Sequence, residues 1–108
     1  MDKDKREKGK KELETLSMMF ERWLKSDFNW ALGVVQKEGR TWEEDEWDFL
    51  RRDWIDKLES WVGPFVRRLR ITGYITDEEV SEFGRNAAEN IKIMLEALNK
   101  LGVKENNE

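Results

Sequence analysis

Apolar side chains recur at helical spacing along most of this chain. Between residues 10 and 37 they follow one another at intervals of three and four residues, and they cover about half the circumference of a helix. A second stripe runs from Trp47 to Val62, and a third runs from Val80 to Leu101. No stretch shows the strict alternation of apolar and polar residues that is typical of a strand. The pattern therefore predicts an all-α protein.

Capping residues and glycines mark where these helices begin and end. Gly39 suits the left-handed position that follows a last helical turn. Thr41 with Glu44, and Thr76 with Glu79, have the spacing of a capping box, in which each side chain bonds the backbone N–H of the other residue. Long helices joined by such short connections predict an antiparallel bundle.

The second stripe meets a Gly63–Pro64 pair. Pro64 lacks a backbone N–H and disfavours a helical conformation for Gly63, so we expect the helix to kink or end there. The residues that follow predict a short helix that stops at Gly73. The predicted fold is thus an antiparallel bundle of three long helices plus one short helix after Gly63–Pro64.

The distribution of charge divides the chain into three parts. Residues 1–9 are almost all charged and end in Gly9, so we expect them to form a disordered, solvated lead-in. Residues 10–102 have the length of a single helical domain with its own hydrophobic core. Residues 103–108 are expected to form a loose tail.

Two charged residues stand inside the apolar stripes, Asp27 in the first and Arg51 in the second. If the hairpin turns at Gly39, residues whose numbers sum to 78 lie at the same level, and Asp27 and Arg51 satisfy that sum. We therefore predict an ion pair between them, because an unpaired buried charge is costly. The alternative is that one or both side chains extend to solvent at the edge of the bundle.

Tryptophan is frequent in this chain, with six residues in 108. Two sets of indoles repeat at intervals of seven residues, so the members of each set share one helix face. These indoles fill the bundle core, form a helix-mediated interface or line a ligand site. Because six are many for so small a core, we expect some at an interface, together with apolar residues off the main stripes. The predicted interface residues are Met18, Trp23, Trp30, Trp47, Phe49, Trp54, Trp61 and Ile93.

The absence of two residue types narrows the possible chemistry. The chain has no cysteine and no histidine, which excludes disulfides, thiolate zinc sites and nucleophile–base pairs built on either residue. We expect no cofactor, no bound metal and no catalytic activity. Charged residues make up 41% of the chain, a proportion that fits a thermophile. Because no apolar stretch has the length of a membrane span and the N-terminus has no signal-like segment, we expect a cytoplasmic protein.

A group of arginines supports a second hypothesis, a nucleic-acid-associated protein. Arginine side chains next to aromatic residues hold phosphates and stack on bases. The net charge of −4 does not favour such a partner. The predicted contacts are Arg51, Arg52, Arg67, Arg68 and Arg70.

The acidic run EEVSE, residues 78–82, supports a third hypothesis. It resembles the EExxE element of the all-α nucleotide pyrophosphohydrolases of the MazG type, which bind magnesium through helix carboxylates. The second element of that family, ExxD on the next helix, has only EALN at residues 96–99 as a counterpart. The resemblance implies a magnesium-dependent nucleotide hydrolase, which requires a carboxylate facing Glu78, Glu79 and Glu82 across a pocket. The simpler interpretation is that acids in a first helical turn complement the helix dipole.

The preferred interpretation is a small, non-catalytic helical protein that acts through protein–protein contacts. It works as a homo-oligomer or as a small subunit of a larger assembly. We expect the aromatic first helix and the tryptophan-rich second helix to supply the contact surface, with indoles as anchors.

Overall fold

The structure, a computed structural model, describes residues 2–38 and 44–106. Within this part of the chain every regular element is a helix, which confirms the prediction of an all-α protein. The elements are α1 (Asp2–Glu38), α2 (Glu44–Lys57), the π-helical segment η1 (Leu58–Val62), α3 (Gly63–Ile71) and α4 (Asp77–Asn106).

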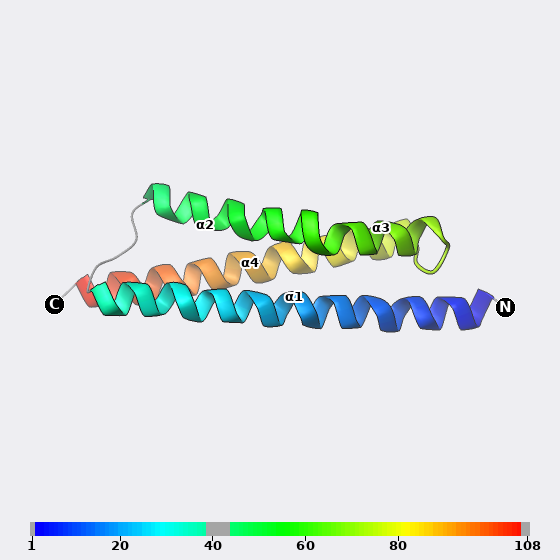
Figure 1. The fold of residues 1–108 in the computed structure, drawn as a ribbon, viewed down its shortest axis with the longest axis horizontal. Helices are drawn as coiled ribbons and strands as arrows, with labels where there is room; N and C mark the ends of the chain where they lie inside the picture. The colour runs from blue at the N-terminus through cyan, green and yellow to red at the C-terminus, as the bar shows by residue number, and fades with distance from the viewer. Residues whose placement is uncertain (1, 39–43, 107–108) are drawn as a thin grey trace.

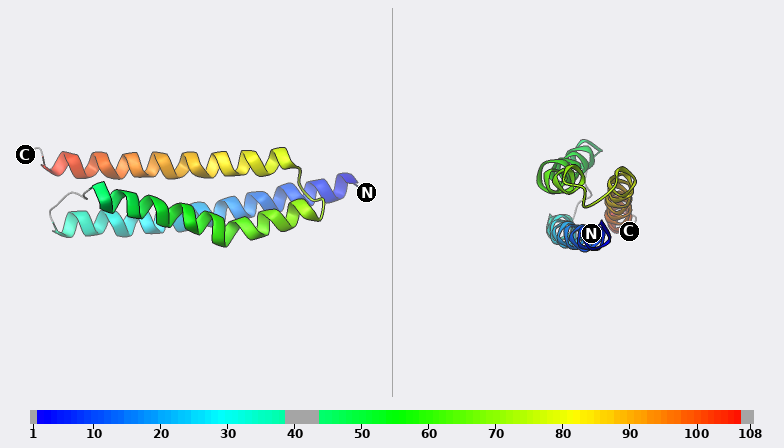
Figure 2. Two further views of the ribbon diagram at one scale, coloured as in Figure 1. Left: turned by 90° about the horizontal axis from the view of Figure 1, so that it is seen from above. Right: turned by 90° about the vertical axis from the view of Figure 1, so that its right-hand side faces the viewer.

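The helices form an elongated molecule, with extents of 62 × 20 × 17 Å (Figure 1). α2, η1 and α3 follow one another end to end as one rod, which we call the middle rod. Figure 1 shows that α1 and α4 run in one direction and that the middle rod runs in the other. The end-on view in Figure 2 places α1, the middle rod and α4 at the corners of a triangle. Each helix therefore has one side that faces the core and one that faces outward.

The middle rod passes through Gly63–Pro64 without ending. Gly63 is helical, with φ −50° and ψ −47°, and its N–H donates to the carbonyl of Leu58 five residues earlier. This wider π-helical turn comes just before Pro64, which stands in the first turn of α3. The N–H groups of a first turn have no carbonyl partner within their own α-helix, so the missing N–H of Pro64 costs α3 no hydrogen bond. Figure 2 shows the rod changing direction at this place. The sequence predicted a kink or an end, and it did not predict the π-helical segment.

The core runs along the axis of the triangle. Its most completely buried large side chains are Trp54, Leu24, Leu98 and Val62, which come from all three sides. No polar or charged side chain of the described residues is buried to the same degree. The apolar stripes of the sequence therefore form the core, and the high charge of the chain lies on the outside.

The N-terminal residues differ from the expected disordered lead-in. α1 begins at Asp2. Gly9 is buried, and it lies so close to Tyr74 that a Cβ at this position would stand 2.1 Å from the Tyr74 carbonyl oxygen. The ammonium of Lys5 lies 5.0 Å from the Tyr74 ring centroid. Lys, Arg and Glu are good helix formers, so a high density of charge does not prevent a helix that has a turn to pack against. The C-terminal end differs too, since α4 continues past Gly102 to Asn106.

The predicted start of α4 is confirmed. The Thr76 hydroxyl accepts a hydrogen bond from the Glu79 N–H at 3.2 Å, and the Glu79 carboxylate accepts one from the Thr76 N–H at 3.0 Å. Gly73 has φ +84°, the left-handed conformation expected of the glycine that stops α3. The predictions for Gly39 and Thr41 lie outside the described residues.

Candidate interaction surface

Asp27 and Arg51 do not form the predicted ion pair. The Asp27 carboxylate instead accepts a hydrogen bond from the indole N–H of Trp54, at 2.5 Å. Arg51 pairs with Asp48 on its own helix, at 3.1 Å. The Asp27 carboxylate on α1 therefore has a hydrogen-bond partner on α2, the Trp54 indole. The prediction that Asp27 needs a partner on α2 was right, but the predicted partner, Arg51, was wrong.

The error has a simple geometric origin. The hairpin was assumed to turn at Gly39, but α1 ends at Glu38 and α2 begins at Glu44, so the midpoint is near residue 41. Residues at one level then have numbers that sum to about 82, and Asp27 and Trp54 sum to 81. A buried indole also needs an acceptor for its N–H, which is the signal that the sequence offered for this pair.

An aromatic cluster joins α1 to the middle rod on the outer side of this hydrogen bond. The ammonium of Lys57 lies 5.6 Å from the Trp23 ring centroid and 5.9 Å from that of Trp61. Trp23 also stacks with Phe20, with ring centroids 6.1 Å apart. Both indoles are half-buried. A cation between two indoles holds the two helices together and fixes the orientation of both rings.

Large apolar side chains extend outward from this cluster. On α1, Met19 and Trp30 lie four residues before and seven after Trp23, and hence on the same side of the helix. On the middle rod, Phe49 precedes Lys57 by two helical steps of four. Phe65 stands two residues before Arg67, which faces α4, and so lies on the side of α3 away from α4. All four are exposed, Trp30 to 60% and Phe49 to 74%. We call this set the α1/α2 surface: Met19, Trp23, Trp30, Phe49, Trp61 and Phe65.

The other predicted interface residues lie elsewhere. Trp54 is fully buried and belongs to the core. Met18, 59% exposed, continues the steps of four from Lys10 and Glu14, which face α4. Ile93 is also exposed and lies seven residues after Asn86, which faces α1. Met18 and Ile93 therefore flank the α1/α4 boundary, away from the α1/α2 surface. The side chain of Trp47 falls outside the described part of the structure.

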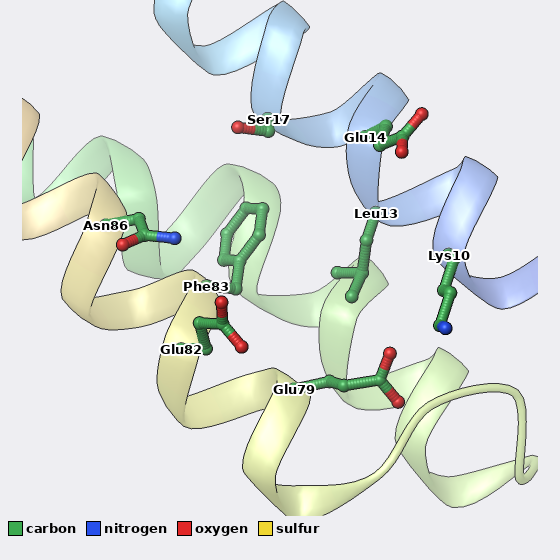
Figure 3. A pocket seen from close by; sticks show the side chains of 8 residues that line it. All are labelled: Lys10, Leu13, Glu14, Ser17, Glu79, Glu82, Phe83 and Asn86. Carbon is green, nitrogen blue, oxygen red and sulfur yellow. The ribbon is translucent and has the colours of Figure 1, made fainter.

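A shallow pocket of about 310 Å³ lies between α1 and α4 (Figure 3). Figure 3 shows Leu13 and Phe83 pointing into the space between the helices, with polar side chains around them. The residues that line it are Lys10, Leu13, Glu14, Ser17, Glu79, Glu82, Phe83 and Asn86. Its chemistry is that of a solvated helix–helix boundary, with one lysine among three carboxylates.

Glu79, at the edge of this pocket, is bound to its own neighbours. Its carboxylate accepts hydrogen bonds from Thr76 and from the guanidinium of Arg6 on α1, the latter at 2.5 Å. Burial raises the pKa of Glu79, but the Thr76 hydrogen bonds and the Arg6 charge outweigh it, so the pKa lies below its ordinary value. The carboxylate thus connects the start of α1 to the cap of α4.

The acidic run does not form a magnesium site in the described structure. Glu78 is exposed, Glu79 is paired with Arg6, and Figure 3 shows the carboxylates of Glu14, Glu79 and Glu82 without a common centre. Among the residues described, no three carboxylates are placed so that they could hold a metal ion. Glu14 of α1 faces Glu79 and Glu82 of α4 across this pocket, but its carboxylate does not complete a metal-binding group with theirs.

The arginines do not gather into one patch. Arg51 is paired with Asp48, and Arg70 is paired with Asp77 at 3.1 Å. Arg67 lines a hollow beside α4, and Arg51 lies sixteen residues earlier, about 24 Å along the rod at 1.5 Å per residue. Two of these arginines are neutralised by carboxylates, and the arginines are spread along the rod, so the positive potential available to a nucleic-acid backbone is weak.

That hollow, of about 530 Å³, lies between α4 and the second half of the middle rod. Its lining is mostly apolar, with Glu59 and Arg67 among the residues at its edge. The other lining residues are Leu58, Gly63, Val66, Val80, Phe83, Gly84 and Ala88. Glu59 is the one carboxylate of this lining and Arg67 its one cation, and the other lining residues are apolar or glycine, as in a packing groove between two helices.

Sequence reasoning missed Met19 and Phe65 as members of the surface, and Lys57 as the cation over Trp23 and Trp61. The steps of four from Phe49 through Lys57 to Phe65 were visible in the sequence, but the π-helical turn at residues 58–62 changes which side of the rod such steps follow.

Among the described residues, none of the helices combines the length and the apolar composition that a membrane span requires. No family model matches the chain, and neither a curated protein nor a solved structure shows significant similarity to it.

Proposed function

We propose that this chain is a non-catalytic protein that acts through protein–protein contacts made by the α1/α2 surface. Its protomer is an antiparallel bundle of α1, the middle rod and α4, and it works as a homo-oligomer or as a small subunit of an assembly. The observation that carries the proposal is the exposure of large aromatic side chains, above all Trp30 and Phe49, on one side of a highly charged chain.

The physical reason is the area involved. A full aromatic side chain presents about 200 Å², so the exposed fractions of Trp30 and Phe49 leave about 250 Å² of ring surface in water. Met19 and Phe65 are also exposed and extend this area. The largest apolar patch on a typical soluble monomer is about 300–600 Å² and is often functional, so exposed apolar area of this order supports an interaction site. Aromatic residues are the usual anchors of such contacts, because they combine area with rigidity.

The test is affinity capture of the full chain from its source organism, with quantitative mass spectrometry of the bound proteins, including untagged copies of the chain itself. Two variants are compared, Phe49→Ser on the α1/α2 surface and Met18→Ser on the α1/α4 side, each of which removes one exposed apolar side chain. We expect Phe49→Ser to reduce the bound proteins at least fivefold, which corresponds to about 1 kcal/mol of contact free energy, and Met18→Ser to leave them unchanged. Equal binding by both variants would refute the proposal.

A further inference from the structure

The outer side of α1 changes character along its length. Eleven of the thirteen residues from 2 to 14 are charged, whereas only one of the eleven from 26 to 36 is. That one is Asp27, whose carboxylate is bonded to Trp54. Depletion of charge on an exposed surface is the compositional mark of the centre of an interface. Of the α1/α2 surface, Trp30 lies in this uncharged stretch, and Phe49 of α2 lies at its level.

Side-chain size alternates along the exposed stripe of α1. The stripe advances by four and three residues in turn, the spacing of a heptad seam: Met19, Trp23, Ser26, Trp30, Gly33 and Lys37. The large residues Trp23 and Trp30 are each followed, three residues later, by a small one, Ser26 and Gly33. A Cβ at Gly33 would extend into open space, so no side chain fills this position of the stripe.

Phe49 lies near the level of this open position. The Asp27–Trp54 hydrogen bond pairs residues whose numbers sum to 81, so the level of Phe49 on α1 is that of residue 32. Its exposed ring stands on the side of the middle rod that faces α1. Phe49 and Gly33 therefore lie at nearly the same level of the two helices.

We infer that a second copy of this chain covers the stripe, with the two α1 helices antiparallel about a twofold axis at the level of Phe28. The inference rests on the proposed function and names its partner. In this register, Trp23 of one copy lies over Gly33 of the second copy, and Trp30 lies against Ser26 of the second copy. Each indole enters the space left by a small residue, in the manner of knobs into holes.

Other arrangements keep at most half of this fit. A parallel pair places each tryptophan beside its own counterpart. An antiparallel pair shifted by one heptad either sets Trp23 against Ser26 but Trp30 against Met19, or sets Trp30 against Gly33 but moves the partner of Trp23 to residue 40, beyond the end of α1. The register centred at Phe28 sets both tryptophans against small residues.

The contact is expected to be weak. A seam of six side chains on one helix covers less than the roughly 800 Å² per copy of a standard interface, so the two copies together bury about 1,200 Å² or less, the lower end of the range for specific interfaces. The dissociation constant is then on the order of 10 μM. Monomer and dimer are both populated at concentrations accessible to sedimentation.

A size swap tests the register, because Ser26 and Trp30 face each other across the axis and both are exposed in the single chain. Ser26→Trp sets two indoles against each other, and Trp30→Ser sets two serines against each other. We expect each single variant to raise the dissociation constant of the dimer at least tenfold in analytical ultracentrifugation. The double variant Ser26→Trp/Trp30→Ser restores the large–small fit and returns the constant to within about threefold of the original.

Met18→Ser is the matched control, since it removes an exposed apolar side chain from the other side of α1 and leaves dimerisation unchanged. Far-UV circular dichroism confirms that each variant remains helical. A chain mass of 13.0 kDa at every concentration, or a double variant as weak as the singles, overturns the inference. In either case the proposed function stands if capture still depends on Phe49, so the two failures are distinguishable.

Discussion

The Asp27–Trp54 hydrogen bond offers the sharpest test of how the bundle is held together. Trp54 is fully buried, and its indole N–H has the Asp27 carboxylate as acceptor. A hydrogen bond to a charged group contributes about 1.5–3 kcal/mol to stability. Removing one partner leaves the other unsatisfied near the core, whereas removing both leaves no unmet group.

The perturbation is a double-mutant cycle with Asp27→Leu and Trp54→Phe. We expect Asp27→Leu to lower the free energy of unfolding by about 2 kcal/mol, because the buried N–H loses its acceptor. Trp54→Phe should lower it by about 3 kcal/mol, since the smaller ring also removes buried contacts. The double variant should lose less than the sum, with a coupling energy of about 1.5–3 kcal/mol.

The measurement is urea unfolding followed by far-UV circular dichroism, which does not depend on the fluorescence of the substituted indole. Asp56→Leu, at an exposed position on α2, replaces Asp27→Leu in a control cycle and should couple to Trp54→Phe by less than about 0.5 kcal/mol. Purely additive effects for Asp27 and Trp54 would refute the role given to this hydrogen bond.

Three further predictions concern the packing of α1. Gly9→Ala should destabilise the protein by about 1–3 kcal/mol in urea unfolding, because its methyl group would collide with the turn before α4, and an unchanged midpoint would contradict that packing. The folded-state pKa of Glu79 lies below its ordinary value, so its contribution is present above the unfolded-state pKa of about 4.3 and is lost as pH falls through the folded-state pKa. The stability difference between the native chain and Glu79→Gln should therefore shrink below pH ~4, and a difference independent of pH would be inconsistent with this. Lys57→Met should lower stability by about 0.5–1 kcal/mol in thermal unfolding through loss of the ammonium between Trp23 and Trp61, whereas a more stable variant would argue against that contact.

The sequence predictions that succeeded depend only on residues close together in the chain. Periodicity predicted the helices, and the Thr76–Glu79 box and Gly73 followed from backbone geometry that depends only on neighbouring residues. The choice of Arg51 as the partner of Asp27 failed because it needed the length of a connection, and an error of about two residues in the midpoint changes the facing residue. The prediction of a disordered lead-in failed for a related reason, because the helix found there packs against Tyr74, sixty-five residues away from Gly9.

The surface was only partly predictable. Heptad spacing identified Trp23 and Trp30 but grouped them with Trp54, which the structure places in the core. Sequence periodicity gives the side of a helix and not what covers that side, so the sequence prediction included Met18, which lies toward α4, and omitted Met19, which is part of the α1/α2 surface. The packing of three rods decides which apolar side chains remain outside.

The most direct test of the central claim, that the α1/α2 surface is covered by protein, is photocrosslinking in the source organism. A benzoyl-phenylalanine replaces Phe49 in one strain and Met18 in a matched strain, both at exposed positions of the full chain. We predict covalent protein adducts from position 49 and none from position 18, with a second copy of the chain as the main adduct. An absence of adducts from position 49, or the same adducts from both positions, would contradict the claim.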